Sequence, residues 1–195
     1  NVYGINSSAK TKSNAVILHS SYKLNDRWKL GINAGSISGD NGKTSEFKAL
    51  YLNPNYQIAD LMFRYNMRAV TNNAQSIYDS AITNTDFIKA YANYKNAAWD
   101  WYLAFIYATA KEAGKSGQTA LNHETNTTYT ATRAQSKEYG YEVDLGADYK
   151  WNTNISLGAK IGYHFVGEYY EFTNETTEQP TSDSYAGQIK LGIKF

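Results

Sequence analysis

The chain has 195 residues, of which 42% are hydrophobic and 15% aromatic, and it contains 18 Tyr, 2 Pro and no Cys. Its 19 Lys and Arg residues nearly balance its 18 Asp and Glu residues, so charge gives no reason to expect a nucleic-acid partner. The lack of cysteine excludes disulfides and thiolate chemistry, and no segment approaches the roughly 20 apolar residues that a transmembrane helix needs.

Alternation of apolar and polar residues predicts β-strands, because successive side chains of a strand point to opposite faces. In the first half of the chain, the turn Asn25-Asp26 separates two such segments. Leu61 and Phe63 alternate with Met62 and Arg64 in a later one. The strands expected here cover residues 2–9, 16–24, 28–34, 45–52 and 61–68.

The second half alternates over longer stretches. The final segment carries Ile189, Leu191 and Ile193 on one face, and ends on an aromatic residue, Phe195. An alternating last strand that ends in Phe resembles the closing strand of Gram-negative outer-membrane β-barrels. The strands expected here cover residues 87–95, 98–110, 139–151, 155–169 and 184–195, which makes about ten in all.

Short and long connections between these strands alternate along the chain. Outer-membrane barrels combine short periplasmic turns with longer extracellular loops. This rule predicts a periplasmic C-terminus and extracellular long loops in the bacterial outer membrane. The short connections are 25–26, 53–56, 96–97 and 151–154, and the long ones are 38–44, 71–86, 111–137 and 171–183.

Aromatic residues cluster near the expected strand ends, as they do at the two interfaces of a bilayer. The group beside short turns is Trp28, Trp99, Trp101, Tyr149 and Trp151, and the group toward long loops is Tyr139, Tyr163, Tyr169 and Tyr170. The predicted fold class is therefore all-β: a transmembrane antiparallel up-and-down β-barrel formed as a single domain by residues 1–195. The alternative is a soluble sandwich or small barrel, which would bury the same apolar face inside.

The chain begins with Asn, so we expect either a mature product after signal removal or a fragment. In the second case it would be the C-terminal portion of a longer or two-chain barrel.

If the apolar face meets lipid, the opposite face lines a lumen. Carboxylates and lysines on neighbouring strands are then expected to form either a salt-bridge network or a polar conduit that tunes solute passage. The predicted lumen-lining residues are Arg64, Arg68, Lys89, Asp100, Glu142, Asp144, Asp148, Lys160, His164, Glu168, Lys190 and Lys194.

Three functions follow from this placement. The first is a porin-like passive channel for small polar solutes, narrow because about ten strands leave little room inside. The second is a non-conducting structural barrel that anchors or scaffolds a cell-envelope complex. The third is a barrel hydrolase using His164 and Glu168, although no serine motif stands beside them and we expect no enzyme, no cofactor and no metal site.

Residues 86–170 resemble the C-terminal part of alginate-export-type outer-membrane porins. The motifs that carry the resemblance are W-D-W-Y-L-A-F-I-Y-A-T-A, Y-G-Y-E-V-D-L-G-A-D-Y-K-W and I-S-L-G-A-K-I-G-Y-H-F-V-G-E. The resemblance implies outer-membrane lipid and lipopolysaccharide as surroundings, and a second chain supplying N-terminal strands, or other envelope proteins, as partners. Such porins have arginine-rich lumens, whereas this chain has only four arginines, so no substrate-binding residue is carried over.

Overall fold

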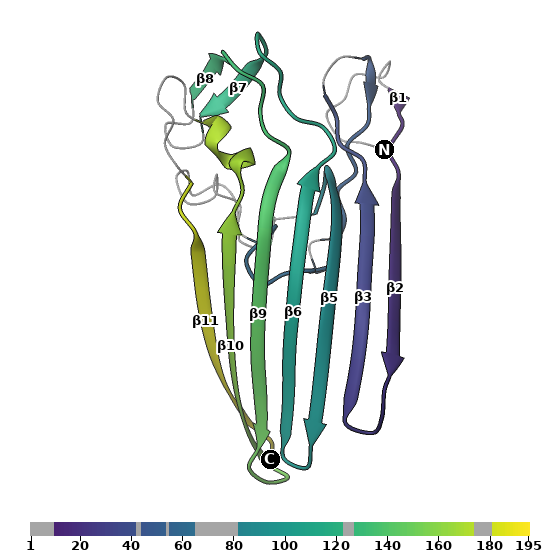
Figure 1. Cartoon of the computed structure of the whole chain (residues 1–195), viewed down its shortest axis with the longest axis vertical. Helices are drawn as coiled ribbons and strands as arrows, with labels where there is room; N and C mark the ends of the chain where they lie inside the picture. Colours follow the sequence, from purple (N-terminus) through teal and green to yellow (C-terminus); the bar gives the residue numbers. More distant parts are fainter. Residues whose placement is uncertain (1–9, 42–43, 54, 65–81, 123–126, 174–180) are drawn as a thin grey trace.

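The computed structural model describes residues 10–41, 44–53, 55–64, 82–122, 127–173 and 181–195. It is an all-β structure built around one seven-stranded antiparallel sheet (Figure 1). The strands follow one another across the sheet in chain order. They are β2 (Ala15–Lys23), β3 (Trp28–Ile37), β5 (Thr85–Asn96), β6 (Trp99–Ala110), β9 (Glu138–Lys150), β10 (Ile155–Val166) and β11 (Ser184–Ile193).

Asparagine side chains close two of the short turns. Asn25 Oδ1 accepts the backbone N–H groups of Arg27 and Trp28, both at 2.9 Å. Asn152 Oδ1 accepts those of Asn154 and Ile155, both at 2.8 Å. This self-capping by Asn is the reason that these short turns could be predicted from the sequence.

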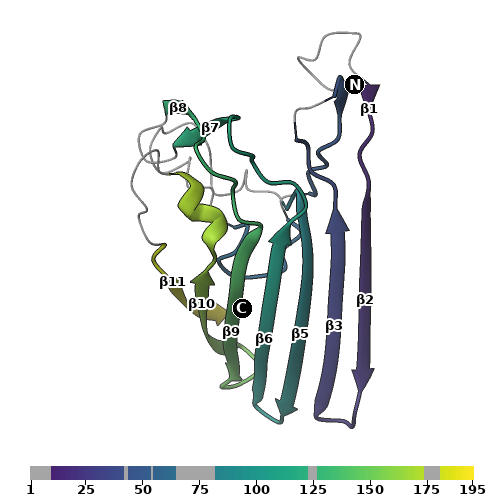
Figure 2. The same cartoon turned by 45° about the horizontal axis from the view of Figure 1, so that its top comes forward.

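The smaller elements lie at the opposite end of the sheet, among the long connections (Figure 2). β1 (Lys10–Thr11) pairs in parallel with β4 (Glu46–Phe47), and β7 (Thr119–Asn122) pairs with β8 (Thr127–Thr130). A 3₁₀ helix, η2 (Glu168–Thr173), follows β10. Across the described parts of the chain, no helix is both long and apolar enough to cross a membrane.

The sheet has one apolar face without cover, here called the outer face. Within the seven strands, all the large apolar side chains that are exposed lie on it, because the register keeps them on the same side of every strand. Ile161 is 51% exposed and Ile189 is 87% exposed. Other members are Leu30, Leu103, Leu145, Leu157 and Leu191.

The opposite face, called the inner face, carries Glu142, Asp144 and Lys160. Toward the loop end it is covered by residues 56–63, which precede β5 in the chain, and a hydrophobic core forms there. The buried core residues are Ile37, Ile58, Ala59, Met62, Ile82, Phe87, Ala104, Ile106, Ala108, Ala110 and Tyr139.

The sheet is open among the described residues. Its two outermost strands, β2 and β11, have one neighbour each and do not pair with one another. Because every neighbouring pair is antiparallel, these two strands run in the same direction. Seven of the about ten expected strands form this sheet, and the expected closed barrel is not formed by the described residues.

Three expected strands differ from the structure. Residues 61–64 form turns on the inner face, since Leu61 and Met62 are both buried there, and residues 65–68 lie outside the described chain. Only Glu46–Phe47 of 45–52 is extended, and it pairs outside the main sheet. The last strand-pairing residue of β10 is Val166, three residues short of the predicted end. Residues 2–9 are outside the described chain.

Tyr139 was expected on the outer face, and this prediction is wrong. The pairing of β6 with β9 shifts between Ala108 and Thr109, and Gly140 has φ of 100°. The extra residue at this bulge reverses the side-chain direction, so Tyr139 enters the core. There it packs on Phe63, Tyr169 and Tyr170, which also removes both η2 tyrosines from the expected outer girdle.

Candidate functional site

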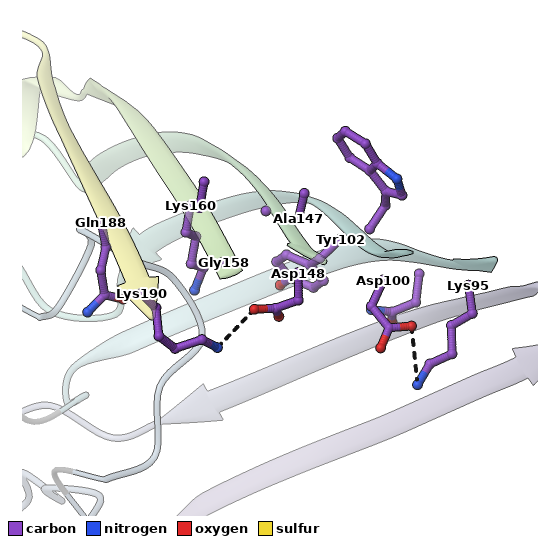
Figure 3. A pocket seen from close by; sticks show the side chains of 13 residues that line it. Lys95, Asp100, Tyr102, Ala147, Asp148, Gly158, Lys160, Gln188 and Lys190 are labelled. Atoms are coloured by element: carbon purple, nitrogen blue, oxygen red, sulfur yellow. Dashed lines mark ion pairs between the residues drawn. The ribbon is translucent and has the colours of Figure 1, made fainter. Parts of the chain in front are cut away.

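The inner face is hollowed near the short turns, where no described segment covers it. The hollow has a volume of about 500 Å³, and its walls come from β5, β6, β9, β10 and β11 (Figure 3). Its polar lining residues are Asn93, Lys95, Asp100, Tyr102, Asp148, Lys160, Gln188 and Lys190.

One ion pair spans three strands inside this hollow. The Lys190 ammonium on β11 lies 2.9 Å from Asp148 Oδ1 on β9, across the intervening strand β10. The residue between them is Gly158, where a Cβ would lie 2.4 Å from the same Asp148 oxygen. Because Gly158 has no side chain, the Lys190 and Asp148 side chains can meet across β10.

A second group shares one carboxylate between two lysines. Asp100 on β6 lies 3.6 Å from the Lys95 ammonium and 3.8 Å from the Lys150 ammonium. Both distances are long and the lysines are exposed, so each pair contributes on the order of 1 kcal/mol or less to folding. The arrangement leaves one positive charge in excess.

On the loop side of the hollow, the carboxylate of Glu142 holds the stretch Ile58–Met62 against the sheet. It is fully buried and accepts three backbone N–H groups: those of Asp60 at 2.7 Å, Leu61 at 2.8 Å and Met62 at 2.6 Å. Three charge-assisted hydrogen bonds offset the cost of burying this charge. The Ile58–Met62 stretch, here called the inner segment, therefore has a fixed position over β9.

Two lysines hold the inner segment from its sides. Lys89 on β5 donates to the Ile58 carbonyl at 2.5 Å, and Lys160 on β10 pairs with the Asp60 carboxylate. Both ammonium groups also lie over the ring of Tyr102, at 5.5 and 5.8 Å from its centre. Contacts from three strands thus converge on four of the five residues of the inner segment.

Asp144 lies beside these contacts, and its carboxylate has an incomplete set of hydrogen-bond partners. It is 1% exposed, and its Oδ1 atom has no hydrogen-bond partner among the described residues. A Cβ at Gly162 would lie 2.9 Å from that atom and 3.2 Å from the Asp60 Cβ, so both carboxylates flank this glycine. The cluster of Asp60, Glu142 and Asp144 contains three acidic groups against two lysines.

The loop-side end of the inner face is dry and aromatic. His164 Nε2 lies 3.0 Å from the Tyr139 carbonyl oxygen, and its ring meets the edge of Tyr170. Burial raises the pKa of Tyr170 above its ordinary value. His164 thus has a packing role with one backbone partner.

The structure divides the predicted lumen residues into three groups. Asp100, Asp148, Lys160 and Lys190 meet in the hollow, whereas Lys89, Glu142, Asp144 and His164 lie beneath the inner segment or the core. Lys194 is exposed beyond the end of β11, Arg64 is exposed in a turn, and Glu168 is exposed in the first turn of η2. Arg68 lies outside the described chain.

Sequence reasoning missed Asp60 and the role of the inner segment. The alternation at Leu61 and Phe63 suggested a membrane strand, but Ile58, Ala59, Leu61 and Met62 are apolar at both parities. A strand with one polar face has apolar residues at alternate positions only. Apolar residues at both parities therefore indicated a segment buried on all sides.

No described group of three or more His, Cys, Asp or Glu side chains has a geometry suited to a metal ion. Comparison of the chain with protein-family models and with curated proteins found no match.

Proposed function

We propose that this protein is an outer-membrane β-protein whose inner face lines a narrow passage for small polar solutes. In this proposal the outer face contacts lipid and lipopolysaccharide, the short turns and the C-terminus are periplasmic, and the long connections are extracellular. The observation that carries it is the complete separation of exposed apolar side chains onto one face of the sheet.

Two physical arguments support lipid as the covering of the outer face. A soluble protein rarely leaves a continuous apolar patch larger than a few hundred Å² in contact with water. The strands are also long enough, because β9 has 13 residues and about 9 to 11 tilted residues span a bilayer. In water, a sheet with this outer face would aggregate.

The passage would begin at the polar hollow and meet the inner segment about halfway along the strands. The open space of the hollow and its charges of both signs suit small polar solutes. The inner segment, held by Glu142, Lys89 and Lys160, narrows the route, so the protein conducts weakly while the segment stays in place.

Planar-bilayer recordings test this function. The purified protein is compared with a variant in which residues 58–62 are replaced by a Gly-Ser segment of equal length. The control carries the same replacement at residues 114–118, in a connection remote from the inner face. We expect small conductance steps for the native protein and the control, and larger steps for the inner-segment variant. Absence of steps from all three proteins rejects the passage.

The second candidate is a non-conducting scaffold for an envelope complex. The observation that favours it is the dry core, which fills the loop-side end of the inner face with Ile37, Phe87, Ile106 and their neighbours. It predicts no conductance even from the inner-segment variant, together with a defined partner crosslinked in cells. Isolation from the membrane as a free monomer argues against it.

A further inference from the structure

Positive charge is concentrated at the turn end of the sheet, where Lys95 and Lys190 line the hollow, although the chain as a whole has a net charge of only +1. At the turn end of the sheet, Lys23, Lys29, Lys95, Lys150, Lys190 and Lys194 face a smaller acidic set. That set is Asp26, Asp100 and Asp148. Lysines therefore outnumber carboxylates two to one in this part of the molecule.

Existing ion pairs neutralise only part of this lysine charge, since Lys23 and Lys190 have one aspartate partner each. Asp100 serves both Lys95 and Lys150, and among the described side chains no carboxylate lies within ion-pair distance of Lys29 or Lys194. Lys23 and Lys29 stand directly opposite each other in the β2–β3 register. Like charges in that position repel each other, so a negative charge bound nearby would reduce the repulsion.

The hollow also contains neutral hydrogen-bond donors, and its size suits a small ligand. Asn93, Tyr102 and Gln188 line it beside Lys95 and Lys190, and its volume of about 500 Å³ admits a small organic ion. Figure 3 shows the lysine side chains entering this space from β5, β10 and β11. A cleft with one excess sign of charge raises the local concentration of the opposite ion, by about tenfold or more at low salt.

We propose that the hollow is a binding vestibule for small anionic solutes that carry carboxylate or phosphate groups. The proposal rests on the proposed function, in that it names the class of solute entering the same passage. Lys95 and Lys190, with the neighbouring lysines of the turn end, supply the charge, and the Asn93 and Gln188 amides supply neutral hydrogen bonds. Asp148 and Asp100 hold the lysine side chains extended into the hollow.

The chain has no cysteine, so a single introduced thiol reports on the hollow. We would measure how fast Asn93→Cys reacts with two methanethiosulfonates of similar size, one bearing a sulfonate and one a trimethylammonium group. The reference is Thr132→Cys, an exposed position in the β8–β9 connection at the opposite end of the sheet. We expect the sulfonate-to-ammonium rate ratio to be about tenfold higher at position 93.

Matched lysine variants assign this preference to the hollow. In the Asn93→Cys protein, Lys95→Gln with Lys190→Gln should lower the ratio at least about threefold. Lys115→Gln in a remote connection should leave it unchanged, and about 1 M salt should abolish it because the Debye length falls to about 3 Å. Equal ratios at positions 93 and 132, or a ratio insensitive to Lys95 and Lys190, overturns the proposal. Gln188→Cys replaces Asn93→Cys if the latter does not fold.

Failure of the two proposals can be told apart. Thiol reactivity is measured on the folded protein in detergent, whether or not the protein conducts. A high sulfonate preference without conductance steps would establish an anion site and reject the passage. Conductance steps without sulfonate preference would do the reverse.

Discussion

The carboxylate of Glu142, on β9, accepts the backbone N–H of Met62 at 2.6 Å, although 80 residues separate the two in the chain. Two further N–H groups, from Asp60 and Leu61, reach the same carboxylate. A single side chain thus accepts three of the hydrogen bonds by which the sheet positions the inner segment.

Replacement of Glu142 by Ala should lower the free energy of unfolding by about 3 to 5 kcal/mol, because three buried N–H groups lose their acceptor. Glu142→Gln should cost less, since one amide oxygen remains as an acceptor. Urea unfolding of the protein in detergent measures both. Glu138→Ala, at the exposed start of the same strand, is the control. A loss below about 0.5 kcal/mol for Glu142→Ala would contradict the role assigned to this carboxylate.

Gly140 is expected to tolerate no side chain. Its φ is 100°, and a Cβ would lie 2.0 Å from the Phe165 carbonyl oxygen. Gly140→Ala should therefore destabilise the protein by more than about 1 kcal/mol. Gly187→Ala is a matched control on β11, where the nearest atom to a Cβ would be 3.7 Å away. Equal melting temperatures for the two variants would show that the bulge does not require glycine.

Two adjacent residues of β11 test which face meets lipid. Ile189 lies on the outer face and Gln188 on the inner face. Ile189→Arg should reduce assembly into lipid vesicles by about 2 to 4 kcal/mol, the cost of arginine at the middle of a bilayer, whereas Gln188→Arg should assemble normally. Vesicle assembly can be followed by protease protection. Normal assembly of Ile189→Arg would place the outer face away from lipid.

The four tryptophans offer a measurement without mutation. Trp28, Trp99, Trp101 and Trp151 all lie on the outer face or just beyond it, at the end with the short turns. Indole rings favour the membrane interface. Tryptophan fluorescence should therefore be quenched more by lipids brominated near the headgroup than by lipids brominated near the chain ends. Stronger quenching by the lipids brominated near the chain ends would contradict the placement of the short-turn end of the sheet at the membrane interface.

Local rules predicted the seven long strands and their short turns well. Alternation marked β9, β10 and β11 because each has one apolar and one polar face, and Asn25 and Asn152 marked turns that their own side chains close. The Asp148–Lys190 pair also followed from strand parity.

Features set by distant contacts could not be predicted. The inner segment resembles a strand locally, and its position depends on Glu142, about 80 residues further along the chain. Tyr139 has the parity of an outer residue, and only the bulge at Gly140 turns it inward. In both cases one long-range contact or one backbone angle overrides the structure that the local alternation of apolar and polar residues predicts.

The equal direction of β2 and β11 limits how this sheet can form a closed ring. A cylinder with antiparallel seams throughout alternates up and down, so it must contain an even total of strands. The seven-stranded sheet can meet that condition only by adding one, three or another odd number of strands between its two free edges. Two copies of the sheet inserted with the same orientation would instead meet at two parallel seams.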